Sequence, residues 1–160
     1  MIFLTVGSMF PFDRLIRAVD AMVAEGTITE RVIAQIGDGR YQPRHMEFER
    51  FLTKPQYENR VSEARVLVAH AGAGTIDLAL AGNKPLLVVP RLKRFGEHVN
   101  DHQVATARKF EQLGHVLAAY ELMDIPGKLA ELGAFSPRPR LVDPERMARR
   151  IGEFIDLMGT

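Results

Sequence analysis

The six residues from His70 to Thr75 place two glycines, a histidine and a hydroxyl directly after the apolar run 66–69. Apolar residues at helical spacing follow, so this turn opens a helix. The first N–H groups of a helix have no partner within it and, with the helix dipole, form a site for anions, typically phosphate. We expect Gly72 and Gly74 to adopt positive φ angles and approach the ligand closely, and Thr75 to cap the helix or donate its hydroxyl. A strand-to-helix turn without a ligand is the alternative.

A second polar segment, residues 91–103, follows the next apolar run, Pro85 to Val89. Ligands of open α/β sheets bind outside the carboxyl ends of the strands, so we expect this segment to lie beside the glycine turn. Cations, imidazoles and amides suit a ligand with phosphates and sugar hydroxyls. For the cations, which include Lys93 and Arg94, a solvated loop is the alternative. The candidate ligand-binding residues of the segment are Arg91, His98, Asn100, Asp101, His102 and Gln103.

A third turn, Gly7-Ser8, ends the apolar run 2–6. Pro11 and Asp13 follow, and these residue types begin helices. The arrangement of strand, glycine turn and helix start thus occurs twice. We expect Gly7 and Ser8 to face the same ligand, and a tight turn without a ligand is again the alternative.

Apolar spacing along the chain predicts an α/β fold with a parallel sheet and helices on both faces, because strand and helix patterns alternate. Pro126-Gly127 is expected to interrupt one helix, and Gly82-Asn83 to end another. The predicted strands are 2–6, 31–36, 46–52, 66–69, 85–89 and 116–118, and the predicted helices are 11–25, 55–64, 75–81, 103–113, 123–132 and 144–158.

The composition favours one globular domain over residues 1–160 with a real core. A net charge of +1, from 21 basic and 20 acidic residues, argues against general binding of nucleic acid. There are no cysteines, which excludes disulfides and thiolate metal sites. No apolar run reaches the roughly 18 residues of a membrane span, and no signal peptide is recognised. We therefore expect a cytoplasmic protein.

Three motifs together, HAGAGT at 70–75, the Lys-Pro pair at 84–85 and GEHVNDHQ at 96–103, resemble the C-terminal domain of glycosyltransferase family 28, the MurG-like family. The resemblance covers roughly residues 1–120. It is closer to the small split members, in which this domain is a separate polypeptide. These are the PssE-like subunits of bacterial exopolysaccharide glycosyltransferases and the cytosolic catalytic subunit of the dolichol-linked N-acetylglucosaminyltransferase. The resemblance implies a Rossmann-like domain equivalent to the C-terminal half of a GT-B enzyme.

The resemblance also implies a site for a UDP-sugar. Gly7, Ser8 and the turn from His70 through Ala73 would lie at the donor diphosphate, Gln103 would bind sugar hydroxyls, and the backbone near Phe51 and Leu52 would meet uracil. The family's acidic ribose ligand falls at Leu78 in this chain, which leaves the preceding Asp77 as the candidate. Members of the family need no bound metal for the chemistry, so neither a metal nor another cofactor is expected.

The function implied is a two-component inverting transfer of a sugar from UDP-sugar to a lipid-linked acceptor. The catalytic base, the acceptor site and the membrane anchor would belong to a second subunit, and this chain would lie at the inner face of the membrane through that subunit. The predicted helix 144–158 either packs on the chain's own core or docks the partner. Two alternatives stay open: a non-catalytic nucleotide-sugar-binding or regulatory module, and a UDP-sugar hydrolase or epimerase.

Overall fold

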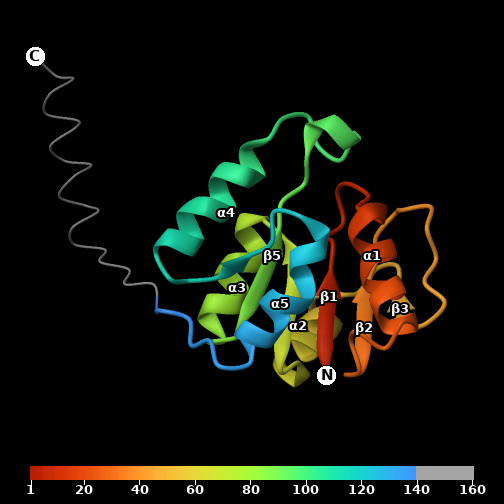
Figure 1. The fold of residues 1–160 in the computed structure, drawn as a ribbon, viewed down its shortest axis with the longest axis horizontal. Coiled ribbons are helices and arrows are strands. Elements are labelled where there is room, and N and C mark those ends of the chain that lie inside the picture. The colour runs from red at the N-terminus through yellow and green to blue at the C-terminus, as the bar shows by residue number, and fades with distance from the viewer. Residues whose placement is uncertain (140–160) are drawn as a thin grey trace, which may run out of the picture.

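A single parallel sheet of six strands forms the centre of the computed structural model, which describes residues 1–139 (Figure 1). The strand order is β3-β2-β1-β4-β5-β6, and every pair of neighbours is parallel. The four central strands are buried on both faces, as their continuous apolar runs predict. The strands are β1 (Ile2–Thr5), β2 (Val32–Gln35), β3 (Glu47–Glu49), β4 (Val66–His70), β5 (Leu86–Val89) and β6 (Leu117–Ala118).

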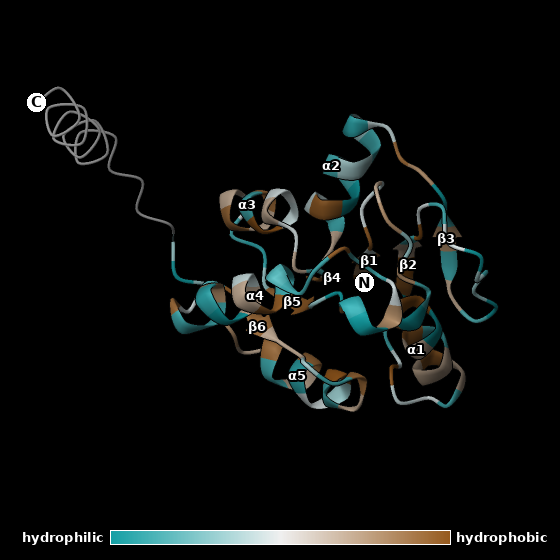
Figure 2. Ribbon diagram, turned by 90° about the horizontal axis from the view of Figure 1, so that it is seen from above, coloured by the Kyte–Doolittle hydropathy of each residue, from teal (hydrophilic) through white to brown (hydrophobic). Residues whose placement is uncertain are grey.

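Helices cover both faces of the sheet, and each face has its own apolar core. Figure 2 shows α1 and α5 on one side and α2 and α3 on the other. Alternation along β1 explains the division, because Leu4 packs with Leu15 of α1 whereas Phe3 packs with Ile76 of α3. The helices are α1 (Asp13–Ala24), α2 (Lys54–Glu63), α3 (Ala73–Ala81), α4 (His102–Gln112) and α5 (Ile125–Leu132), with short 3₁₀ helices at η1 (Lys93–Phe95) and η2 (Leu122–Asp124).

The order in which the chain lays down its strands creates a crevice between β1 and β4. From β1 the chain moves outward through β2 to β3, then returns to place β4 on the other side of β1 and continues to β5 and β6. The loops after β1 and β4 therefore leave the sheet in opposite directions at this topological switch point. Open α/β sheets bind ligands at such a point. The α/β fold predicted from the sequence is confirmed.

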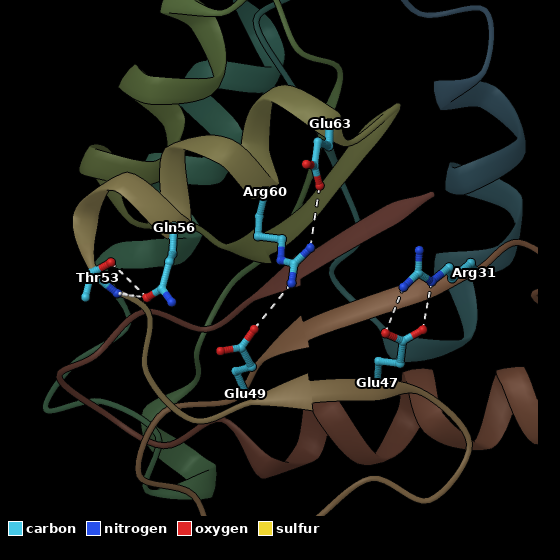
Figure 3. Close-up of polar contacts among 7 residues, drawn as sticks. All are labelled: Arg31, Glu47, Glu49, Thr53, Gln56, Arg60 and Glu63. Carbon is cyan, nitrogen blue, oxygen red and sulfur yellow. Dashed lines mark hydrogen bonds and ion pairs between the residues drawn. The ribbon is translucent and has the colours of Figure 1, made fainter.

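Charged side chains cover the outer edge of the sheet at β3 (Figure 3). Arg31 donates two hydrogen bonds to the Glu47 carboxylate, at 2.7 and 2.8 Å, and Arg60 of α2 reaches Glu49 at 3.4 Å. The first pair is well exposed, so its contribution to stability is small. Its effect is to leave a short, charged edge that disfavours pairing with another strand. β3 is accordingly shorter than the strand 46–52 that the sequence predicts.

Several predicted helix boundaries shift. Helix α3 begins at Ala73 rather than at Thr75. Pro126 does not interrupt a helix but lies in the first turn of α5, where a missing N–H costs nothing. Helix α3 ends at Ala81 with Gly82 as its C-cap, and the left-handed residue that follows is Asn83, with φ of 49°. The predicted terminal helix 144–158 lies outside the described residues.

Candidate functional site

A pocket of about 720 Å³ opens at the switch point, at the carboxyl edge of the sheet. The loop after β1 forms one wall, and the turn between β4 and α3 forms another. Residues from the ends of β2 and β5 and from the first turn of α4 complete the lining, together with the segment that leads into α2. The lining residues include Val6, Gly7, Ser8, Met9, Phe10, Gln35, Phe51, Leu52, Lys54, Tyr57, His70, Gly74, Thr75, Arg91, His98 and Gln103.

The turn between β4 and α3 carries a helix N-terminus toward this pocket. Gly72 is the residue before the helix, and the first N–H bonded within the helix is that of Ile76, to the Gly72 carbonyl at 3.1 Å. The N–H groups of Ala73, Gly74 and Thr75 thus lie in the turn whose donors have no partner inside a helix. The expected positive φ angles are wrong, because Gly72 has φ of −92° and Gly74 is helical. Of the two roles expected for Thr75, the cap is wrong, because Thr75 lies inside the helix, while a hydroxyl donor stays a prediction.

Space, and not φ, requires a glycine at position 72, whereas nothing in the protein itself requires one at position 74. A Cβ at Gly72 would overlap Nε2 of His70, whereas a Cβ at Gly74 would meet nothing within 4 Å. Gly74 lines the pocket, so the missing side chain leaves the helix N-terminus open to a ligand. The turn therefore combines one glycine that accommodates a histidine ring with one that keeps the backbone accessible.

His70 lies between the two glycine turns. Its ring faces Gly72 on one side and Gly7 on the other, where an added Cβ would lie 2.9 Å from Cε1 of the ring. Burial, followed by the positive charge of Arg91, lowers the pKa of His70 to about 4. Nδ1 is buried without a hydrogen-bond partner. The imidazole is therefore neutral near pH 7, and its placement suits a residue that spaces the two turns.

The turn after β1 has the left-handed conformation that its glycine permits, since Gly7 has φ of 73°. Gln35, at the end of β2, accepts a hydrogen bond from the Gly7 N–H at 3.2 Å and donates one to the Gly7 carbonyl at 3.1 Å. We did not identify Gln35 from the sequence. The available signal was a polar residue at the carboxyl end of a buried strand, next to the predicted site.

Arg91 is buried, with 3% of its surface exposed, so the solvated loop considered for it from the sequence is wrong. Its Nη2 donates to the carbonyls of Val6 and Phe10, at 2.6 and 2.5 Å. Burial lowers the pKa of Arg91 to about 10, which still leaves the guanidinium charged at neutral pH. The neighbouring cations Lys93 and Arg94 are exposed. A fixed positive charge therefore lies at the floor of the site.

Glu97 holds the loop that follows β5. Its buried carboxylate accepts hydrogen bonds from Nε and Nη2 of Arg14, at 2.6 and 2.9 Å, and from the Leu92 N–H at 2.9 Å. Neither charged residue was predicted from the sequence to belong to the site. The pair joins α1 to the loop and so fixes the wall of the site that carries His98.

Of the remaining polar residues of this loop, one lines the pocket and the others form hydrogen bonds within the loop. His98 lines the pocket, with its ring 4.9 Å from that of Phe10 and 4.4 Å from that of His102. Asn100 accepts a hydrogen bond from the His102 N–H at 3.1 Å, and Asp101 accepts one from the Lys93 N–H at 2.7 Å.

Six predicted ligand contacts are not among the residues that line the pocket. Asn100, Asp101 and His102 are exposed and organise the start of α4. Asp77 is exposed on α3, and Gly72 and Ala73 lie where that helix begins. A role for these six in donor binding stays a prediction.

Gln103 lies in the first turn of α4 and is 4% exposed. Its Oε1 accepts a hydrogen bond from the Arg91 N–H at 3.1 Å. The opposite wall of the pocket carries Phe51 and Leu52, the region expected near uracil, together with Tyr57. Polar and apolar walls thus face each other, as a ligand with a charged centre and a flat ring requires.

Neither a metal cluster nor a membrane span is found in the part of the chain that the structure describes. No group of three histidine, aspartate or glutamate side chains there could hold a metal ion. None of the helices within residues 1–139 is long and apolar enough to cross a bilayer.

Comparison with known proteins places the chain in a family. The family described as "Glycosyltransferase family 28 C-terminal domain" matches residues 1–151. The UDP-N-acetylglucosamine transferase subunit ALG13 of Homo sapiens is 29% identical over 143 residues, covering 83% of this chain and 12% of the human protein. The Mus musculus protein of the same name is 29% identical over 123 residues, covering 71% of this chain and 10% of its own length. The chain thus spans a small part of these curated relatives.

Solved structures share the fold. The glycotransferase of kitacinnamycin has a TM-score of 0.61 at 20% identity, covering 83% of this chain and 34% of that chain. The NMR solution structure of ALG13 has a TM-score of 0.55 at 22% identity, covering 90% and 91%. MurG of Acinetobacter baumannii has a TM-score of 0.54 at 17% identity, covering 82% and 40%. The sheet is that of the C-terminal, Rossmann-like half of a GT-B glycosyltransferase, and the chain belongs to the glycosyltransferase family 28 C-terminal domain family.

Proposed function

We propose that this chain is the donor-binding subunit of a two-component inverting glycosyltransferase, which moves a sugar from a UDP-sugar to a lipid-linked acceptor in the synthesis of an exopolysaccharide or related glycan. The observation that carries the proposal is the pocket at the switch point, where the N-terminus of α3 and the turn after β1 face each other beside a buried guanidinium. This arrangement suits a diphosphate.

The chemistry of the proposed reaction follows from the charge that develops on UDP as it leaves. Donors that are fixed before the reaction stabilise such charge most effectively. The N–H groups of Ala73, Gly74 and Thr75 and the charge of Arg91 would supply this stabilisation without a metal ion. Gln103 would bind hydroxyls of the sugar, and the wall at Phe51 and Leu52 would contact the base.

The acceptor site and the general base are assigned to a second subunit. An acceptor hydroxyl must lose a proton as it attacks the anomeric carbon. His70 lines the pocket between the glycine turns, and its pKa of about 4 makes it a weak base near pH 7, which suits spacing rather than proton transfer. This chain matches 34% of the kitacinnamycin enzyme and 40% of MurG, so the remainder of those enzymes has no counterpart within residues 1–160. The mammalian relatives are themselves described as subunits.

Calorimetry tests the donor site. The isolated chain is titrated with UDP in buffer containing magnesium and in buffer containing EDTA, and we expect modest binding in both. The absence of heat in every buffer contradicts the donor site, and binding that EDTA abolishes contradicts metal-independent recognition. A screen of UDP-sugars by saturation-transfer NMR then identifies the sugar. Hydrolysis of a UDP-sugar by the chain alone would favour the hydrolase alternative over the transferase.

A further inference from the structure

The loop from Gly7 to Phe10 is held by two side chains that come from other strands. Gln35 extends from the end of β2, and Arg91 follows the end of β5. We propose that Gln35 and Arg91 are positioning residues, which keep this loop in the shape that receives the donor before any donor binds. The inference rests on the proposed function for the identity of the ligand, whereas the rigidity of the loop is a property of the free chain.

Gln35 forms hydrogen bonds with both the N–H and the carbonyl of Gly7. Its Oε1 accepts hydrogen bonds from the Thr5 hydroxyl at 2.8 Å and from the Gly7 N–H at 3.2 Å. Its Nε2 donates to the carbonyls of Gly7 at 3.1 Å and Arg50 at 3.0 Å. A glutamine amide has two acceptor positions and two donor hydrogens. All four are used, so Gln35 lines the pocket with no hydrogen-bonding capacity left for a ligand, and its effect on binding passes through Gly7.

Close packing encloses the Gly7 carbonyl on its other side. A Cβ added at Gly37 would lie 2.9 Å from that oxygen, so the turn after β2 fits against the turn after β1 only because residue 37 is a glycine. Gly37 itself is in the left-handed region, with φ of 61°. The peptide that follows Gly7 therefore has little room to rotate.

Arg91 fixes the two ends of the loop. One nitrogen, Nη2, donates to the carbonyl of Val6, which precedes the loop, and to that of Phe10, which ends it. The guanidinium carbon also lies 5.3 Å from the centre of the Phe12 ring, within cation–π range. The Arg91 side chain is itself buried, as is the bond to Val6. Gln35 and Arg91 thus constrain the start and the end of one short loop.

Preorganisation of this kind raises affinity because the ligand does not have to order the loop. The test measures loop order and ligand affinity separately in the 160-residue chain. Backbone ¹⁵N relaxation reports the order of Gly7 to Phe10 without UDP, and calorimetry reports UDP affinity. The variants are Gln35→Leu, which removes all four bonds, and Arg91→Met, which removes the loop contacts and the charge. Gln35→Glu keeps both acceptor bonds and is the milder variant if Gln35→Leu fails to fold.

The matched control is Tyr41→Phe. It removes the hydrogen bond from the Tyr41 hydroxyl to Asp20 at 2.7 Å, a contact to a buried carboxylate that holds a different loop. Any general loss of stability should appear in this variant without a change at Gly7 to Phe10. We expect loop order parameters of about 0.85 in the free wild-type chain and in the control, and below about 0.6 in Gln35→Leu and Arg91→Met. UDP affinity should fall about tenfold or more in those two variants only.

Each outcome bears on a different part of the proposal. A loop that stays rigid in Gln35→Leu and Arg91→Met overturns the inference, and so does a free wild-type loop that becomes ordered only when UDP is added. A loosened loop with unchanged UDP affinity overturns its role in donor binding. If the wild-type chain does not bind UDP at all while loop order still depends on the two residues, the positioning role stands and the proposed function fails.

Discussion

The side-chain oxygen of Gln103 accepts a hydrogen bond from the Arg91 N–H at 3.1 Å, which joins the first turn of α4 to the residue after β5. This bond fixes the orientation of the amide, because only its oxygen can accept. The two donor hydrogens of the nitrogen and the second acceptor position of the oxygen are then left for a ligand. The sequence-based prediction that both ends of the amide serve the sugar therefore stays open.

Truncation of Gln103 should therefore have two separable effects. Gln103→Ala leaves the Arg91 N–H without its acceptor, which should lower the free energy of unfolding by about 1–3 kcal/mol. Gln103→Glu keeps an acceptor and should be closer to wild type in stability. Both variants should weaken the UDP-sugar more than UDP, because each removes the amide N–H donors that would reach the sugar hydroxyls. Urea denaturation and calorimetry measure the two effects, and equal losses for UDP and UDP-sugar would contradict the sugar contact.

Substitution of the two glycines of the β4–α3 turn should have different effects, a loss of stability at Gly72 and a loss of ligand affinity at Gly74. Gly72→Ala places a methyl group against the His70 ring, and overpacking of this kind typically costs about 1–3 kcal/mol. A Cβ at position 74 would meet no neighbour within 4 Å, so the fold of Gly74→Val should persist, while the side chain enters the pocket and weakens UDP and UDP-sugar alike. Thermal unfolding and calorimetry check the pair. Normal UDP affinity in a folded Gly74→Val chain would contradict the phosphate site at α3.

The sequence predicted the sheet and the loops that form the site because apolar runs and glycine turns are local signals. It did not predict why individual residues are there. The conformations of Gly72 and Gly74 depend on His70 and on where α3 begins, and spacing alone does not fix a helix start to within two residues. A glycine in a turn indicates either a positive φ or a close neighbour, and the sequence does not distinguish the two.

The other features missed from the sequence are hydrogen bonds between residues that are far apart in the chain. Gln35 meets Gly7 across 28 residues, Glu97 meets Arg14 across 83, and Arg91 meets Val6 across 85. Each contact is set by the order of strands in the sheet, which brings distant loops to one edge. Without the strand order, a charged residue in a polar loop is predicted to be exposed to solvent. For this reason the burial of Arg91 could not be predicted from its neighbours in the chain.

Stability should depend on pH through His70. The pKa of this imidazole is about 4 in the folded chain and 6.5 when unperturbed, so between these values the unfolded chain binds a proton that the folded chain does not. The free energy of unfolding should be insensitive to His70 above pH 6.5 and should fall by about 3 kcal/mol in total as the pH drops to 4.

Urea denaturation at pH 7.5, 6.5, 5.5 and 4.5 measures this effect in wild type and in His70→Asn. Burial raises the pKa of Asp20, but hydrogen bonds from Arg44, Tyr41 and His45 lower it overall below its usual value of 3.8, so Asp20 titrates below this range. Groups other than His70 contribute equally to both proteins. The difference between the two curves therefore isolates His70, and parallel curves would show that its burial does not suppress protonation.

The last prediction concerns the partner. Val99 and Met9 are 68% and 84% exposed on loops at the carboxyl edge of the sheet, where a second half would close the pocket. Val99 does not line the pocket, so Val99→Ser should leave UDP binding unchanged while it lowers affinity for a co-expressed, membrane-anchored subunit about tenfold, the loss expected when a buried valine is removed. Leu113, 43% exposed at the far end of α4, is the matched control, and Leu113→Ser should assemble normally. Transfer of radiolabelled sugar to a lipid acceptor should require both subunits and should fall with assembly in Val99→Ser. Robust transfer by the purified 160-residue chain alone would refute the two-component enzyme.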